Sequence, residues 1–595
     1  MLVEMKNKYT VYILFTLFLI VGCDDDFLNE PPLDRVTEND VWSDKDLMDT
    51  YIFKIYDNMP WDYLKDFGGG AGFGAHRDAL SDLAMSTYSW TPANNTFRPG
   101  IWGTANNTWP LDWWGYFNIW KMNYSIENLE ALGIEVLSEQ EKNNRLGELY
   151  FMRSYSYFAM AKRYGGVPII LDAQDPSTTP EDEYFPTRNT EQEVYDQVLA
   201  DAQKAFDLLP ERWTGEKGRV PRWAAKSLES RAALYAASIA KYGTLELEGL
   251  VGVPTSEMDK YYQISLDASV KVLNEGGYTL FDQYPNKSDN YYRLFIDETE
   301  DESIFVKIWL PFEKGHSYDL RNTPYSYRVD WGSSMSPSKQ LVDSYEMLST
   351  GLLPTEPGSG YDPLQPYNNR DPRLKGTLLT DNDMFQGSRI ETWYGTERNG
   401  DIDTNPDTGV GKDGMGIHPD ATKTGSYVRK YLADGPTPLL VQQYYSGQDC
   451  ILFRLGEIYL NAAEAAFELG MEGAARDYIE PIRTRAGLTE NLRLESFSGT
   501  AFRNRIRNER KIEMAFEDQR YWDVRRWRIA EEALSIQVKG IRSLRHIAPA
   551  GEETFTYEVF DAETLPMSFS PQHYYMPIGQ DRINNNQKLL ENPGY

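Results

Sequence analysis

The feature that most constrains this chain is a short apolar segment near its beginning, which runs from Val11 to Val21 and is followed by a glycine and Cys23. The segment has 11 residues, whereas a helix that crosses a bilayer needs about 20. Two lysines, Lys6 and Lys8, precede it. A positive start followed by a short apolar run is typical of a signal peptide, so we expect residues 1–22 to be removed on export.

The residues around the cleavage point predict a lipid anchor. Ile20, Gly22 and Cys23 resemble the lipobox of bacterial lipoproteins, in which the cysteine is acylated. Each buried CH₂ group contributes about 0.8 kcal/mol, so two or three acyl chains hold a protein at a membrane that it does not span. We therefore predict a lipidated flexible tether over residues 23–39. The acidic run Asp24–Asp26 resembles a surface-export signal of Bacteroidetes lipoproteins, although in other Gram-negative bacteria it would favour retention at the inner membrane.

Composition describes the part of the chain after the tether. Mean hydropathy is −0.56, and no later apolar stretch approaches the length of a membrane span. The formal net charge of −30 repels nucleic acid and anionic lipid, so nucleic acid is not an expected partner. Cys450 has no partner for a disulfide once Cys23 is acylated, and we interpret it as a buried structural thiol. We predict one domain over residues 40–595.

Amphipathic helices are predicted early and late in that domain. The apolar spacing over Glu141–Arg163 indicates a helix that stops at the glycine pair Gly165–Gly166. Thr190 and Glu193 form the pattern of a capping box ahead of a second helix. Further helices are predicted from the residues after Pro221, around Tyr261 to Val272, and from Leu455 to Leu469 with a partner helix around Tyr478.

The alanine-rich faces of these helices resemble tetratricopeptide units, although no strict repeat is visible and a bundle of unrelated helices is the alternative. Between about 277 and 448 helical periodicity fades, and glycine, proline and asparagine become frequent. We predict a loop-rich insertion there. A long irregular segment of this kind is more often functional than idle.

Several motifs in this order resemble the SusD/RagB family of outer-membrane nutrient-binding lipoproteins. The motifs lie at residues 153–168, 454–465, 482–487, 509–527 and 574–578. The resemblance covers nearly the whole mature chain. It implies a mainly α fold, in which tetratricopeptide-like helix pairs form a scaffold and a loop-rich portion binds the ligand. It also implies an outer-membrane, cell-surface location, a SusC-like TonB-dependent transporter as partner, and binding without catalysis.

We interpret the charged motif residues as framework. The basic segment from Arg503 to Arg528 is interleaved with acids. Helical spacing predicts ion pairs such as Arg505 with Glu509 and Arg510 with Glu513, at the surface or partly buried. An anion site there is the less favoured reading.

Glycan contacts are predicted from composition alone, because the family's ligand residues follow no motif that can be aligned. A sugar needs flat aromatic rings with polar groups beside them. Two segments have that composition, and the candidates are Trp90, Arg98, Trp102 and Trp109 in the first and Trp309, Arg321, Tyr325, Tyr327 and Trp331 in the second. A buried anchor is the competing role for each tryptophan. Trp113, Trp114 and Trp120 lead into a helix at helical spacing and are predicted to lie in the core.

A calcium site is a weaker hypothesis. Asp401, Asp403, Asn405 and Asp407 match the start of an EF-hand loop, but Pro406 replaces the glycine at the sixth position. No other cofactor is predicted.

The leading function from the sequence is a surface lipoprotein that captures oligo- or polysaccharide and delivers it to a transporter. A lipid-anchored glycoside hydrolase is the main alternative, because with 90 acids a catalytic carboxylate pair has no position that the sequence identifies. A peptide-binding or protein-binding helical scaffold is the third.

Overall fold

The computed structural model describes residues 38–61, 77–104, 111–133, 135–299, 301–435, 444–563 and 566–595, with side chains from residue 40 onward. The signal segment and residues 23–37, which include Cys23 and most of the predicted tether, lie outside these ranges, whereas the last two residues of the predicted tether, Glu38 and Asn39, begin a helix. None of the helices in the described ranges combines the length and the apolarity that a membrane span requires.

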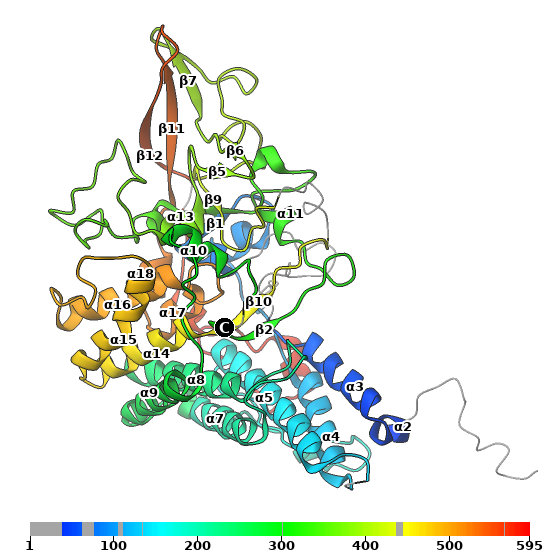
Figure 1. Ribbon diagram of the computed structural model, residues 1–595. Helices are drawn as coiled ribbons and strands as arrows, with labels where there is room; N and C mark the ends of the chain where they lie inside the picture. Colours follow the sequence, from blue (N-terminus) through cyan, green and yellow to red (C-terminus); the bar gives the residue numbers. More distant parts are fainter. Residues whose placement is uncertain are drawn as a thin grey trace, which may run out of the picture.

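A layered set of helices forms one half of the molecule (Figure 1). The long helices are α3 (Lys45–Asp57), α4 (Tyr116–Ala131), α5 (Glu139–Tyr164), α7 (Glu191–Leu208), α8 (Arg222–Tyr242), α9 (Met258–Glu275), α14 (Leu455–Glu468), α15 (Glu472–Arg485) and α16 (Gly499–Glu513). They pack on one another in succession: α4 on α5, α5 on α7, α7 on α8, α8 on α9, α9 on α14, and α14 on α15 and α16. The predicted mainly α fold is confirmed.

Local signals explain where these helices begin and end. Ser138 and Thr190 close capping boxes with Glu141 and Glu193 at the starts of α5 and α7, and the second of these was predicted. Helix α14 ends at Glu468, and Gly470 two residues later has a φ of +81°, in the left-handed region that glycine adopts without strain. Helices α7, α8 and α14 carry many fully buried alanines, and such small side chains let the axes of packed helices approach closely.

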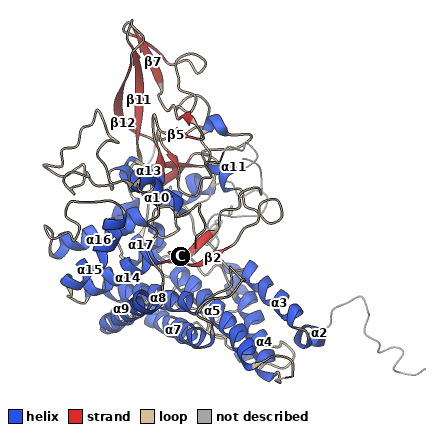
Figure 2. Ribbon diagram, viewed as in Figure 1, coloured by secondary structure: helices blue, strands red, loops and turns tan. Residues whose placement is uncertain are grey.

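The other half carries short elements joined by loops, and most strands lie there (Figure 2). The shorter helices of the two halves together are α2 (Glu38–Ser43), η2 (Arg77–Leu80), η3 (Ala93–Phe97), α6 (Glu181–Tyr184), η4 (Leu247–Gly249), η5 (Thr255–Glu257), α10 (Lys287–Arg293), α11 (Tyr318–Asn322), η6 (Tyr325–Tyr327), α12 (Lys339–Val342), α13 (Arg373–Thr377), α17 (Arg520–Arg526), α18 (Ala530–Leu534), η8 (Pro571–Tyr574) and α19 (Gln580–Asn585).

The described strands form small sheets. They are β1 (Ala84–Ser86), β2 (Ser303–Lys307), β3 (Met335–Pro337), β4 (Leu378–Leu379), β5 (Met384–Phe385), β6 (Ser388–Arg389), β7 (Gly395–Arg398), β8 (Asp401–Asp403), β9 (Tyr427–Val428), β10 (Cys450–Arg454), β11 (Lys539–Ile547) and β12 (Glu553–Asp561). β12, β11, β7 and β8 form a four-stranded sheet that projects from the body, while β1 pairs with β3, β2 with β10, β4 with β9 and β5 with β6 (Figure 1).

A network of buried charges joins the two halves, and we call it the core ion network. At its centre, Arg454 at the end of β10 places Nη1 2.8 Å from Glu302 and 2.8 Å from Glu513, and Nε 2.7 Å from Glu517. Glu513 also forms ion pairs with Arg373 of α13, at 2.8 Å, and with Arg485 of α15. All these side chains are at most 2% exposed. The motif charges are therefore framework, as predicted.

The pairing within the network differs from the expected one. Arg505 lies 3.0 Å from Glu346 and Arg510 lies 2.9 Å from Asp523, rather than pairing with Glu509 and Glu513 on their own helix. The prediction of surface or partly buried pairs along one helix was wrong, because both arginines are buried and reach across to neighbouring elements.

Removing one partner from this network should destabilise the fold strongly. We expect Arg454→Met to lower the free energy of unfolding by about 3–5 kcal/mol, because three buried carboxylates would each lose one of their positively charged partners. Arg493→Met is a matched control, since Arg493 also contacts three acids, Asp477, Glu480 and Glu495, but its side chain is 33% exposed. Urea unfolding should show the loss in the first variant alone. Equal loss in both would contradict the role of burial.

Acid should weaken the same network. Burial alone would raise the pKa of Glu513, but Arg485, Arg454 and Arg373 together hold that pKa well below its usual value of 4.5. A depressed carboxyl pKa contributes stability above pH 4.5 that is lost as the pH falls toward the folded-state pKa. Urea unfolding at stepped pH should show stability declining below about pH 4.5, and Glu513→Gln should be less stable at pH 7 with a shallower decline. If the wild type and Glu513→Gln lost stability in parallel as the pH fell, Glu513 would not be the source of the acid sensitivity.

Candidate functional site

A short antiparallel strand pair brings together two segments that are far apart in the chain. β1 pairs with β3 in a register that sets Ala84 opposite Pro337 and Ser86 opposite Met335. Because the strands run in opposite directions, the residues just after β1 lie beside those just before β3. The Thr87 amide continues the contact, donating to the Ser334 carbonyl at 3.0 Å.

Three aromatic rings meet at this point, and we call Tyr88, Trp90 and Trp331 the aromatic platform. Trp90 stacks on Tyr88 with ring centroids 5.7 Å apart and planes at 25°. Trp331 meets both rings edge to face, at 5.8 Å from Tyr88 and 6.4 Å from Trp90. Trp90 is 48% exposed and Trp331 half-buried, whereas Tyr88 is buried beneath them. The two predicted segments therefore contribute to one surface.

Polar contacts hold the platform loops in place. The Tyr88 hydroxyl donates to the Gly332 carbonyl at 2.5 Å and accepts from the Gly332 amide at 3.2 Å. Burial raises the pKa of Tyr88, so the hydroxyl stays protonated as a donor. The Asn95 side-chain amide donates to the Trp90 carbonyl at 3.0 Å. The buried Arg321 guanidinium carbon lies 5.3 Å from the centre of the Trp331 ring, within the range of a cation–π contact.

A second stacked pair lies on the far side of Gly332. Tyr325 stacks on His418 with centroids 5.4 Å apart and planes at 27°. Arg328 covers Tyr325 at 4.2 Å and donates to its hydroxyl at 3.0 Å. Asp420 lies 3.8 Å from Arg328 and 3.5 Å from His418. A Cβ atom placed on Gly332 would fall 3.1 Å from that of Arg328, so the second pair is adjacent to the platform loop.

This arrangement suits recognition of a ring with one apolar face. Exposed indole faces pack on C–H groups, while guanidinium donors and carboxylate acceptors at the rim match hydroxyl groups.

The structure corrects three of the candidate glycan contacts. Trp102 is 4% exposed and stacks on His573 with centroids 4.2 Å apart, so it anchors the C-terminal segment. Arg98 is buried and lies 2.6 Å from Glu563. Trp309 is 4% exposed, edge to face with His316. Composition alone does not distinguish a buried ring that anchors a loop from a ring that is exposed on the loop.

The remaining candidates have mixed positions. Tyr325 and Tyr327 are half-buried in η6, and the Tyr327 hydroxyl donates to the Phe385 carbonyl at 2.7 Å, which turns it toward a small core cluster. Trp109 lies outside the described residues.

The calcium hypothesis is not supported by the geometry. Asp401 and Asp403 lie on strand β8, and the Asp403 carboxylate accepts bonds from the Asn405 amide and the Thr408 hydroxyl at 2.9 and 2.7 Å. The Asn405 side-chain oxygen in turn accepts a hydrogen bond from the Asp407 amide. In the described part of the chain, no three histidine, cysteine, aspartate or glutamate side chains gather as a metal site. The segment is a strand and a turn rather than a ligand loop.

Sequence reasoning missed Tyr88, Arg328, His418 and Asp420. Tyr88 lies two residues from Trp90 in the same Tyr-Ser-Trp stretch, and aromatic density was a signal that could have found it. His418 and Asp420 come from a loop some ninety residues after Tyr325, and nothing local in their sequence indicates the contact.

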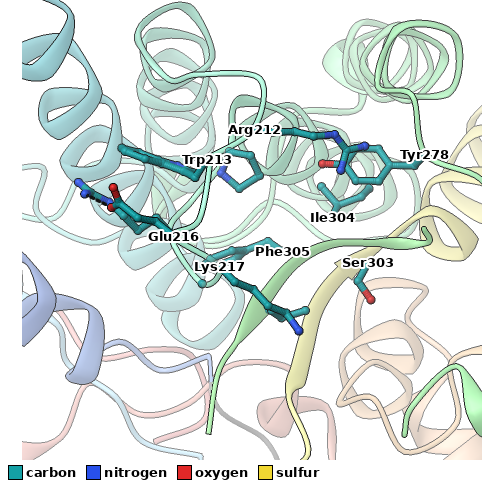
Figure 3. Close-up of a pocket in the computed structure, with 12 residues that line it drawn as sticks. Arg212, Trp213, Glu216, Lys217, Tyr278, Ser303, Ile304 and Phe305 are labelled. Atoms are coloured by element: carbon teal, nitrogen blue, oxygen red, sulfur yellow. Dashed lines mark hydrogen bonds and ion pairs between the residues drawn. The ribbon is translucent and has the colours of Figure 1, made fainter. Parts of the chain in front are cut away.

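Two cavities lie elsewhere, on either side of the loop that precedes α8. One holds about 60 Å³ between that loop and β2, where Arg212 covers Tyr278 at 4.2 Å (Figure 3). It is far smaller than the roughly 300–1,000 Å³ of ligand pockets. The other, of about 900 Å³, lies between α3 and β2 and is lined largely by apolar side chains with lysines at its rim. Neither includes a predicted site residue.

Comparisons with known proteins match almost the whole chain. The family model described as the SusD family matches residues 301–595, and one described as starch-binding associating with outer membrane matches residues 26–234. A SusD-like protein of Bacteroides ovatus is 23% identical over 545 residues, which cover 89% of this chain and 83% of that protein.

Solved structures agree with the fold. A SusD-like protein from Bacteroides fragilis superposes with a TM-score of 0.70 and 25% identity, covering 95% of this chain and all of that one. A second B. fragilis structure, described as a SusD-like carbohydrate binding protein, has a TM-score of 0.69 and 20% identity, covering 92% of this chain and 99% of that one.

The different burial of two predicted site tryptophans can be tested by stability. We expect Trp102→Ala to lower the free energy of unfolding by about 3–5 kcal/mol, as for other buried tryptophans. Trp90→Ala should lower it by less than about 1 kcal/mol, because nearly half of that ring is already in water. Chemical denaturation of the two variants measures both values, and comparable losses would contradict the assigned burial.

Proposed function

The chain belongs to the SusD/RagB family, and from that premise we propose that it captures glycan on the aromatic platform and delivers it to a SusC-like TonB-dependent outer-membrane transporter. The family description of starch binding in association with the outer membrane supports both the ligand class and the location. The B. fragilis structure described as carbohydrate binding has the same fold.

One observation carries the choice of site. Trp90 and Trp331 come from segments more than two hundred residues apart, yet the β1–β3 pairing places their rings 6.4 Å from each other with Trp90 about half in water. Apolar rings that gather into one surface patch favour an interaction site, whereas a single exposed ring does not. Arg328, which is half-buried over Tyr325, places a guanidinium donor at the neighbouring stacked pair, whereas the buried Arg321 lies against the Trp331 ring.

The family is one of binding proteins without catalytic activity, which decides against the glycoside hydrolase. Capture needs stacking and hydrogen bonds that form and break quickly, because the glycan must be released to the transporter. A shallow platform on a rigid support meets that need better than a closed pocket. The lipid that we expect on Cys23 would keep this surface at the membrane in which the transporter lies.

Affinity-gel electrophoresis of the protein from Asp24 onward tests the proposal. Soluble starch should be tried first, followed by a panel of plant, host and microbial polysaccharides. We expect at least one polysaccharide to retard the protein, and Trp331→Ala to weaken that binding at least about tenfold, as for other aromatic hot spots. Trp90→Ala should act in the same direction.

Phe53→Ala is the matched control, because Phe53 is 43% exposed on α3, away from the platform. It should bind like the wild type. No retardation by any polysaccharide would overturn glycan capture in favour of a peptide cargo. Retardation that survives both tryptophan substitutions would overturn the platform as the site.

A further inference from the structure

A second groove lies on the helical half, where the function proposed above does not use it. It holds about 730 Å³ between α4, the segment 170–176 and α6. In Figure 1, α4 lies at the lower end of the molecule, whereas α11, next to the aromatic platform, lies in the upper part. The groove is within the size range of ligand pockets, roughly 300–1,000 Å³.

One wall is a stripe of aromatic rings on α4. Tyr116, Trp120 and Tyr124 are spaced four residues apart and all line the groove, so successive rings rise by about 6 Å along one face of the helix. Trp120 and Tyr124 lie almost parallel, with centroids 5.3 Å apart and planes at 6°. Trp120 is 40% exposed. Its predicted place in the core was wrong, because helical spacing identifies a face without saying what covers it.

The opposite wall is held rigidly. Asn123, which is fully buried, donates from its side-chain amide to the carbonyls of Ile170 and Asp172, both at 3.0 Å. The buried Tyr157 hydroxyl donates to the Ile170 carbonyl at 2.8 Å. The Trp120 indole N–H donates to the Gln174 carbonyl at 2.9 Å, which fixes the ring in the plane that the groove presents. Both walls are therefore formed before any ligand arrives.

The polar groups of the groove define the ligand. Glu127, Asp172 and Asp175 contribute carboxylates, and no lysine or arginine is among the described residues that line it. Carboxylates accept hydrogen bonds from hydroxyl groups and repel anions. Flat rings beside such acceptors suit a neutral pyranose, whereas uronic acids and sulfated sugars would be rejected.

We infer that this groove is a second saccharide-binding site, which takes neutral pyranose units of the same glycan that the aromatic platform binds. The inference rests on the proposed function of glycan capture. When a long glycan chain is bound at one site, its binding to a second site on the same rigid body becomes an intramolecular event. Two sites therefore raise the affinity for a polysaccharide that reaches both of them, but not for a short oligosaccharide that reaches only one.

Trp120→Ala tests the groove, and Phe117→Ala is its control. Phe117 is 70% exposed on the same helix, between Tyr116 and Trp120 in sequence, and it does not line the groove. The ligand is the polysaccharide that retards the wild type, together with a short oligosaccharide of the same linkage. Thermal unfolding of both variants should match the wild type, so that binding differences reflect the groove.

We expect calorimetry to give two oligosaccharides per wild-type molecule and one per Trp120→Ala molecule, with Trp120→Ala weakening polysaccharide binding at least about tenfold. Trp331→Ala should retain a residual retardation that disappears in the Trp331→Ala, Trp120→Ala double variant.

Three outcomes would overturn the inference. If Trp120→Ala binds like Phe117→Ala with one oligosaccharide per molecule in the wild type, the groove is not a saccharide site, while glycan capture by the platform stands. If both α4 variants lose binding equally, the effect does not belong to the groove. If no polysaccharide retards the wild type, glycan capture itself fails and the second site fails with it.

Discussion

Glu513 and the arginines around it are the constraint on which the rest of the structure depends. Guanidinium groups from β10, α13 and α15 converge on this one carboxylate, which is fully buried. A buried charge is tolerated only when it is paired and hydrogen-bonded, so none of these elements can move away without leaving a buried charge unpaired. Hydrophobic contacts could bury the same surface, but they are non-directional and would specify less strictly which strands and helices pack together.

The same use of charge extends to the segments that carry the aromatic platform. Asp82, two residues before β1, lies 2.8 Å from Arg520 of α17 and 2.9 Å from Lys511 of α16. Lys430, just after β9, lies 2.6 Å from Glu517 in the core ion network. The loops that reach Trp90 and His418 are thus tied at their roots to the helical half. A binding surface on loops gains precision when its supports are rigid, and here the supports are ion pairs from the late motif.

Features with local causes could be predicted from the sequence, whereas features that depend on residues far away in the chain could not. Helices α5 and α7 were predicted closely because the apolar period, the capping box at Thr190 and the glycine stop are all local. Trp90 and Trp331 were both predicted, but in separate clusters, because a pairing of three residues per strand leaves too weak a pattern to detect. Trp102, Trp309 and Trp120 were misassigned for one reason: exposure depends on neighbours that the local sequence does not contain. Buried arginines were read as helix-surface pairs because their partners lie on other elements.

The placement of charge also bears on which glycans this surface can approach. The chain has 60 basic and 90 acidic residues, and several of its arginines, among them Arg373, Arg454 and Arg483, are buried in ion pairs. Because those arginines neutralise buried acids, the excess negative charge of −30 is distributed over the remaining, mostly exposed acids. The long-range field therefore opposes polyanionic glycans, and selective contact must come at short range from ring faces and hydrogen bonds. Arg321 beside Trp331 and Arg328 beside Tyr325 place positive charge close to the platform, whereas no lysine or arginine is among the described residues that line the groove, so the platform is the more tolerant of the two aromatic surfaces toward acidic substituents.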